Sequence, residues 1–123
     1  FEEAARGARP KLLPPVIGGA TRQASVRNGL AAIAGAERVL IHDAARPFLP
    51  AAVIERLVAA LDAADGAVPV LPVVDTLAGA SAGSLSDTVP RDQLVRVQTP
   101  QAFRYHAIAA AHRKWAGGDA TDD

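Results

Sequence analysis

The sequence predicts an α/β fold built on a mostly parallel sheet, and three observations support this prediction. Short apolar runs at 38–42 and 67–71 have the composition of strands that are buried on both faces of such a sheet. A stretch with apolar residues at helical spacing precedes each run. With the extended run 12–17, the order is strand, helix, strand, helix, strand, which right-handed crossovers turn into a parallel arrangement.

The first half of the chain supplies the first strand and helix. Two prolines within 12–17 favour a strand end or a sheet edge, and the glycine pair at 18–19 permits close backbone approach. Thr21 is expected to cap the helix that follows. One face of that helix carries apolar residues at helical spacing: Val26, Leu30 and Ile33.

The second helix lies between the runs 38–42 and 67–71. Pro50 suits its first helical position, and Asp65–Gly66 ends it. Its apolar stripe consists of Val53, Ile54, Leu57, Val58 and Leu61.

Residues 72–98 have a different composition from the rest. The extended runs 73–77 and 94–97 flank a segment of small residues, 78–86. We predict a β-arm here, with two extended strands and a flexible tip, that projects from the domain. A final helix is predicted over 105–115.

Composition excludes several classes of protein. The 123 residues suffice for one modest domain, the formal net charge is zero, and there is no cysteine. A neutral chain offers no electrostatic surface for nucleic acid or an anionic membrane, and no apolar run approaches the roughly 20 residues that span a bilayer. Disulfides, thiol nucleophiles and thiolate zinc sites are excluded. We expect a cytoplasmic protein that binds neither nucleic acid nor membrane.

Both ends of the chain look cut. Residues 1–9 have the pattern of a helix tail, and residues 120–123 are a polar segment without a closing element. Glu2 and Glu3 stand where a signal peptide would carry basic residues. We therefore expect the chain to be part of a larger protein.

The first candidate site follows the strand at 38–42. Ligands of open α/β sheets gather outside the carboxyl ends of the strands, and Asp43 offers a carboxylate there that could hold a metal ion. The small residues Ala44 and Ala45 would let a ligand approach the backbone. An Asp in this place also serves simply as a turn former or helix cap, and the segment alone leaves both interpretations open.

The second candidate site is the segment 18–25, where a glycine pair leads into a helix. Ser25 lies on the first turn of that helix, near the end that attracts anions, so the segment could hold a nucleotide. It matches neither a Walker A loop nor a G-x-G-x-x-G fingerprint, and an ordinary strand-to-helix turn also explains the glycines. No histidine is assigned to a metal, because His42, His106 and His112 lack ligand spacing with carboxylates.

Several segments, taken in order, resemble one family. They are GGxxRxxSVxxGL from Gly18, HDAARP from His42, PVxDT from Pro72, Arg91 followed by QTPQxF from Gln98, and ATD from Ala120. This series is similar to the 2-C-methyl-D-erythritol 4-phosphate cytidylyltransferases of the non-mevalonate isoprenoid pathway. The resemblance covers nearly the whole chain, and the ordered set is far more specific than any one motif.

The resemblance implies a Rossmann-like nucleotidyltransferase sheet, mostly parallel, with a projecting β-arm that embraces a second subunit. Residues 1–123 are then a partial cytidylyltransferase domain of a homodimer, in which the arm spans about 72–98. The implied reaction transfers CMP from CTP to a sugar phosphate and releases pyrophosphate, with Mg²⁺ or another divalent cation. Fusion to a further pathway activity, as in some relatives, is one form that the whole enzyme could take.

The resemblance also implies roles for particular residues. Asp43 would serve the Mg²⁺ and the triphosphate, and Arg91 would position the sugar phosphate in the partner's active site. The substrate-binding residues implied by the family are Gly19, Ala20 and Ser25 for cytosine and ribose, Asp43 for the triphosphate, Thr76, Arg91 and Thr121 for the sugar phosphate, and Ala44.

The chain departs from the family pattern in three places. The family's N-terminal glycine-rich loop, which cradles the triphosphate with Arg and Lys, has no counterpart in these residues, nor has the lysine segment expected after Thr121. Val74 stands where the family commonly has arginine. We expect the 123 residues alone to be inactive, and CTP turnover by them would contradict this.

Two other functions remain open at this point. A cytidylyltransferase for another polyol phosphate, such as ribitol 5-phosphate, tends to carry Ser and Val where this chain has Ala44 and Ala45, so the alanines favour methylerythritol phosphate. The chain could also be a nucleotide-binding or dimerisation module without catalysis. Calorimetry with CTP and Mg²⁺, on this chain and on an extended one, would separate a binding module from an enzyme, and an assay with both phosphates would decide between the two substrates.

Overall fold

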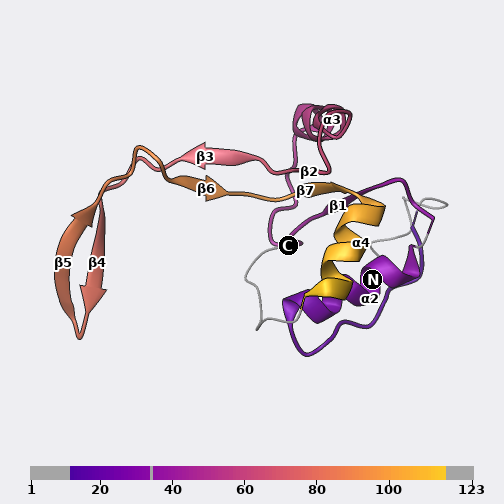
Figure 1. The fold of residues 1–123 in the computed structure, drawn as a ribbon, viewed down its shortest axis with the longest axis horizontal. Coiled ribbons are helices and arrows are strands. Elements are labelled where there is room, and N and C mark those ends of the chain that lie inside the picture. The colour runs from indigo at the N-terminus through magenta and orange to yellow at the C-terminus, as the bar shows by residue number, and fades with distance from the viewer. Residues whose placement is uncertain (1–11, 34, 116–123) are drawn as a thin grey trace. The chain divides into compact units, whose positions relative to one another are not determined.

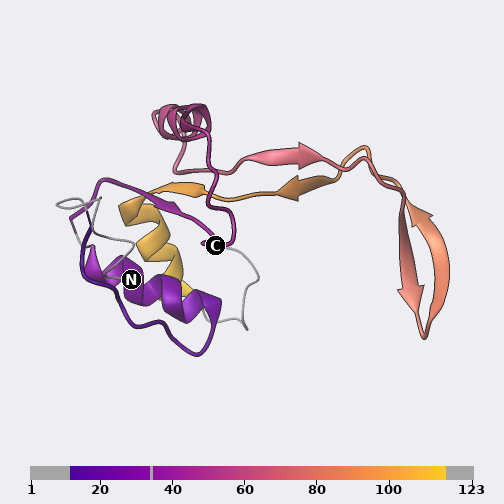
Figure 2. The same cartoon turned by 180° about the vertical axis from the view of Figure 1, so that it is seen from behind.

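The computed structural model describes residues 12–33 and 35–115. The chain divides into two compact units, Phe1–Gly35 with Trp115–Asp123 and Ala36–Lys114, and each unit has its own elements. Figures 1 and 2 show these elements from opposite sides. The expectations for residues 1–9 and 120–123 lie outside the described residues.

Helix α2 (Arg22–Ala32) belongs to the first unit (Figure 1). Thr21 precedes it in an extended conformation, and its Oγ1 accepts a hydrogen bond from the Ala24 N–H at 3.1 Å, which confirms the predicted cap. Leu30, on the predicted apolar face, is buried. The helix ends at Ile33, whose N–H donates to the Leu30 carbonyl at 3.3 Å.

The predicted strand at 12–17 is wrong. Residues 12–19 lie outside any helix or strand of the described structure. Pro14 and Pro15 lack the N–H groups that a ladder requires, so this run cannot make regular backbone pairs on both sides.

The sheet of the second unit consists of β1 (Arg38–Ile41), β7 (Gln101–Arg104) and β2 (Gly66–Ala67), in that order. Both neighbours pair with β7 antiparallel, and Phe103 lies opposite Val39 on one side and Gly66 on the other. The sequence predicts that the strands at 38–42 and 67–71 belong to a parallel sheet. In the described residues, the pairs that β1 and β2 form are both antiparallel. β1 and β2 do run in the same direction, but β7 lies between them.

Helix α3 (Ala51–Ala60) covers this sheet, and its apolar stripe supplies the core. Leu57 and Leu61 are buried against Ala102 of the central strand β7, with Val53 packed at the margin. Pro50 is the N-cap residue and Ala51 the first helical residue, one position later than predicted. Val39 of β1 is buried while Leu40 and Ile41 are only half-buried, so the strand is not buried on both faces along its whole length.

The predicted strand at 67–71 is divided into two. After β2 the chain passes Val68 and Pro69 and continues as β3 (Val70–Pro72), which pairs antiparallel with β6 (Val95–Val97). Pro69 has no N–H to donate, but its carbonyl accepts from the Gln98 N–H at 2.9 Å. The chain thus changes partner strand at this proline.

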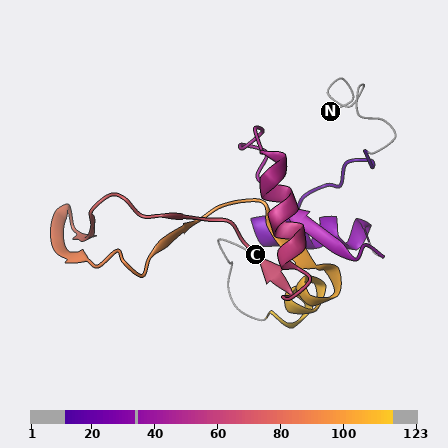
Figure 3. The same ribbon diagram turned by 90° about the horizontal axis from the view of Figure 1, so that it is seen from above.

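The predicted flexible tip at 78–86 instead forms a hairpin. β4 (Leu77–Ser81) pairs with β5 (Ser84–Val89), and the two ladders follow one another along the chain (Figures 1 and 3). The turn residues Ala82 and Gly83 both have positive φ, 49° and 82°. Two left-handed residues match the twist of a two-residue hairpin turn, so this segment is ordered by its turn rather than left loose.

Helix α4 (Tyr105–Lys114) follows β7 directly and ends one residue before the predicted end. Its buried side chains are Ile108, Ala109 and His112. Basic residues occupy its last turn, where positive charge interacts favourably with the negative end of the helix dipole. The Thr99–Pro100 peptide bond, just before β7, is cis. Among the described residues, no helix has the length and hydropathy to cross a bilayer.

Candidate functional site

The glycine segment of the first unit folds back onto the first turn of α2. The Gly19 N–H donates to Ser25 Oγ at 3.0 Å, and the same hydroxyl donates to the Thr21 carbonyl at 2.9 Å. A Cβ at Gly18 would lie 2.8 Å from Ser25 Oγ, so a side chain there would displace the hydroxyl that the Gly19 N–H binds. This geometry brings Gly19 and Ser25 together, with Ala20 next in the chain, and is compatible with both a plain turn and a nucleotide-holding loop.

Gly19 and Gly29 make a matched pair for testing this packing. A Cβ at Gly19 would lie 2.4 Å from Ala24 Cβ and 3.0 Å from Ala24 C, whereas a Cβ at Gly29 meets nothing within 4 Å. We expect Gly19→Ala to lower the stability of the full-length protein by about 1–3 kcal/mol through overpacking. Gly29→Ala should raise it by up to about 1 kcal/mol, since alanine favours the helix. Thermal unfolding of both variants checks this, and equal shifts in the midpoint would contradict the proposed close packing.

Asp43 occupies the first position of a turn at the carboxyl end of β1. The Arg46 N–H donates to the Asp43 carbonyl at 3.0 Å, and the Asp43 N–H donates to Thr99 Oγ1 at 3.2 Å. The carboxylate side chain is 39% exposed, and Ala44 and Ala45 at the turn's centre are exposed. Asp43 is therefore a turn former, and its carboxylate also remains within reach of solvent.

Two further side chains surround this carboxylate. Arg46 Nε lies 3.5 Å from Asp43 Oδ2, and Arg46 Nη1 donates to Gln98 Oε1. His42 Nε2 lies 2.8 Å from the Arg46 carbonyl, which gives His42 a structural partner in the turn. In residues 12–33 and 35–115, no three His, Cys, Asp or Glu side chains are grouped to hold a metal. Asp43 can thus offer only part of a cation's coordination.

A pocket of about 360 Å³ opens next to this turn in the second unit. Its polar side includes Arg46, Gln98 and Thr99, and its apolar side includes Phe48 and Val53. The other lining residues are His42, Leu49, Pro50, Arg56, Pro69, Val70 and Leu71. The lining therefore mixes apolar and polar side chains, and Phe48 among them is 96% exposed.

The predicted arm residues lie where one ladder gives way to the next. Thr76 directly precedes β4 and is exposed. Arg91 follows β5, is also exposed, and donates through Nη1 to the Val74 carbonyl, which lies in the connection between β3 and β4. Thr121 lies outside the described residues. Arg91 therefore links the two connections between the ladders, 73–76 and 90–94, and its proposed role toward a phosphate stays a prediction.

The sequence indicated the Asp43 turn but not its neighbours. Arg46, Gln98 and Thr99 converge on it although Gln98 and Thr99 are more than 50 residues away in sequence. The signal that could have identified them is the antiparallel register of β1 with β7, in which Ile41 lies opposite Gln101. That register places the residues before Gln101 beside those after Ile41.

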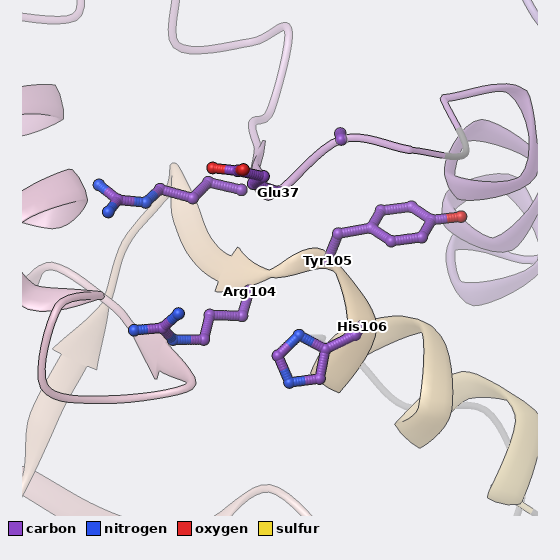
Figure 4. Close-up of a pocket in the computed structure, with 6 residues that line it drawn as sticks. Glu37, Arg104, Tyr105 and His106 are labelled. Carbon is purple, nitrogen blue, oxygen red and sulfur yellow. The ribbon is translucent and has the colours of Figure 1, made fainter.

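A second pocket, of about 330 Å³, lies where β7 joins α4 (Figure 4). Its arginines are engaged elsewhere: Arg38 donates to the Val58 carbonyl at 3.3 Å and contacts the Asp62 carboxylate at 2.7 Å. Arg104 Nε lies 3.8 Å from Asp65 Oδ1. These contacts satisfy the C-terminal end of α3. The lining residues labelled in Figure 4 are Glu37, Arg104, Tyr105 and His106.

Comparisons with known proteins point to one family. A family profile described as IspD, 2-C-methyl-D-erythritol 4-phosphate cytidylyltransferase, matches residues 6–123. The bifunctional enzyme IspD/IspF of Rhizorhabdus wittichii is 67% identical over 113 residues, which are 91% of this chain and 29% of that protein. The 2-C-methyl-D-erythritol 4-phosphate cytidylyltransferase of Cereibacter sphaeroides is 52% identical over 122 residues, or 98% of this chain and 54% of that protein.

Solved structures give the same result for the fold. The crystal structure of 2-C-methyl-D-erythritol 4-phosphate cytidylyltransferase from Thermus thermophilus superposes with a TM-score of 0.76 at 38% identity, over 89% of this chain and 60% of that one. The bifunctional IspDF from Campylobacter jejuni gives 0.72 at 26%, over 94% of this chain and 30% of that one. The chain thus spans 29% of the length of the Rhizorhabdus protein and 54% of the length of the Cereibacter protein. Its fold is a nucleotidyltransferase α/β fold, and the chain belongs to the 2-C-methyl-D-erythritol 4-phosphate cytidylyltransferase family.

Proposed function

We propose that the full-length protein containing this chain transfers CMP from CTP to 2-C-methyl-D-erythritol 4-phosphate and releases pyrophosphate, in isoprenoid precursor biosynthesis. The observation that carries this proposal is the family match over residues 6–123, a range that includes the Asp43 turn. The 67% identity to a relative named as bifunctional supports a second fused activity.

Asp43 is proposed to hold the metal and the triphosphate. Mg²⁺ is usually bound through one or two carboxylates together with substrate phosphates, and it keeps several waters. One partly exposed carboxylate, with no grouped ligand set among the described residues, fits that pattern. When bound, the ion neutralises charge on the triphosphate. Exposed Ala44 leaves the adjacent backbone open to the same ligand.

The remaining side chains are proposed to bring two polyanions into line. A phosphate oxygen of the sugar phosphate forms a bond to the α-phosphorus of CTP, the bond from that phosphorus to the bridging oxygen breaks, and pyrophosphate leaves. No covalent protein group is needed, so positioning and charge neutralisation dominate. Arg91 grips the incoming phosphate, with Thr76 and Thr121 beside it. Gly19, Ala20 and Ser25 hold the cytidine.

Several finer features belong to this proposal. The common direction of β1 and β2 supports their membership in a larger, mostly parallel Rossmann-like sheet. The exposed double ladder from β3 to β6 supports a projecting arm that makes a homodimer and brings Arg91 to the partner's active site. We also assign the enzyme to the cytoplasm, because its substrates are charged metabolites.

A two-substrate assay tests the proposed function. The full-length protein is incubated with CTP, Mg²⁺ and either 2-C-methyl-D-erythritol 4-phosphate or ribitol 5-phosphate, and pyrophosphate release is followed. We expect turnover with the first phosphate and little with the second. Turnover confined to ribitol 5-phosphate, or CTP binding without turnover of either, would contradict the proposal.

A further inference from the structure

We propose that Gln98 is a positioning residue that keeps the Arg46 guanidinium beside the Asp43 carboxylate without letting it close onto that carboxylate. The inference rests on the proposed function, in which Asp43 serves the metal and the triphosphate. Gln98 directly follows β6, the strand that comes after Arg91 in the chain. The position of β6 therefore sets the position of the Gln98 side-chain amide.

Both the backbone and the side chain of Gln98 are held by hydrogen bonds. Its backbone N–H donates to the Pro69 carbonyl at 2.9 Å. Its side-chain Nε2 donates to the Val97 carbonyl at 2.9 Å, and its Oε1 accepts from Arg46 Nη1. Because Nε2 is anchored on the strand, the amide oxygen has a fixed direction, and that direction is toward Arg46.

The turn fixes the backbone of Arg46, and its side chain has two partners, Gln98 and Asp43. Its N–H donates to the Asp43 carbonyl at 3.0 Å and its carbonyl lies 2.8 Å from His42 Nε2, so the turn itself is set. The side chain is 48% exposed, and its Nε lies 3.5 Å from Asp43 Oδ2. A charge-assisted hydrogen bond would be about 2.7–2.9 Å long. The guanidinium is therefore near the carboxylate while its Nη1 is engaged by Gln98.

Removing the amide oxygen changes what Arg46 can do. Without an acceptor for Nη1, the guanidinium is free to form a two-bond pair with the Asp43 carboxylate, the arrangement that arginine and carboxylates favour. Such a pair occupies the same oxygens that a divalent cation would need. The consequence is a weaker affinity for Mg²⁺–CTP, with no loss of any group that itself contacts the nucleotide.

Titration calorimetry of the full-length protein with Mg²⁺ and CTP tests this role. We expect Gln98→Leu, which keeps the size and removes the acceptor, to raise the Kd about tenfold, as for groups that orient metal ligands. Gln98→Glu keeps an oxygen for Arg46 and should restore the affinity. Gln93→Leu, the same change in the exposed turn after Arg91, should leave it unchanged. Gln98→Met, which also lacks the acceptor, replaces Gln98→Leu if thermal unfolding shows that the latter does not fold.

A double-mutant cycle with Arg46→Met identifies the route of the effect. If Gln98 acts through Arg46, Gln98→Leu has no further effect on the Kd once the guanidinium is gone. Wild-type affinity in Gln98→Leu, or an additive loss in the double variant, would overturn the positioning role. A wild-type protein that fails to bind Mg²⁺–CTP would instead refute the proposed function, so the two failures are distinguishable.

Discussion

Asp43→Asn in the full-length protein should lower kcat/KM for cytidylyl transfer by about 100- to 1000-fold, equivalent to about 3–4 kcal/mol of transition-state stabilisation. The amide has the same shape but lacks the charge that would hold the metal against the triphosphate. The turn should survive, because its hydrogen bonds use the Asp43 backbone N–H and carbonyl. Steady-state kinetics at several Mg²⁺ concentrations measures the loss.

Asp87→Asn is the matched control for this substitution. Asp87 lies on the exposed strand β5, which pairs with β4 and not with the strand that precedes the Asp43 turn. The same change of carboxylate to amide there should leave kcat/KM near the wild-type value. A full loss in both variants would point to a general charge effect, and full activity in Asp43→Asn would exclude Asp43 from the metal site.

Arg91→Ala should mainly raise the KM for the sugar phosphate, by about 10- to 100-fold, because a charge-assisted contact of about 1.5–3 kcal/mol is removed. The KM for CTP should change little, since Arg91 is assigned to the other substrate. Kinetics with each substrate varied in turn separates the two constants.

The structural role of Arg91 must be separated from its binding role. Its Nη1 donates to the Val74 carbonyl, so the alanine variant also loses a hydrogen bond between the two connecting segments of the arm. Arg91→Lys keeps the charge and a donor but not the planar fork, and should recover only part of the affinity. Arg96→Ala, on the paired strand β6 nearby in sequence, controls for lost charge and should not alter either KM. An unchanged KM in Arg91→Ala would remove Arg91 from the phosphate site.

Local chemistry made some elements predictable. The Thr21 cap and the apolar face with Leu30 depend on neighbouring residues, and α2 forms as expected. The Asp43 turn follows equally from a strand that ends in an acid and small residues. The hairpin was not expected because its segment is rich in alanine, glycine and serine. It forms because Ala82 and Gly83 adopt positive φ, which lets β4 and β5 pair.

Long-range pairing was the part that the sequence could not provide. β7 has no continuous apolar run, so Gln101–Arg104 gave no strand signal, yet it is the central strand of the described sheet. Its register with β1 decides that Gln98 and Thr99 meet the Asp43 turn. Pairings of this kind depend on which strands lie together, and one-dimensional periodicity does not encode that choice.

The proposed function depends above all on the carboxylate at the end of β1 as the protein's ligand to the metal–nucleotide complex. A crystal structure of the full-length protein with CTP and Mn²⁺ tests this, because anomalous scattering locates the metal. We expect a metal peak at coordination distance from an Asp43 oxygen, with the triphosphate on the same ion. A metal bound to the triphosphate with Asp43 turned away from it would contradict the proposed role of this residue.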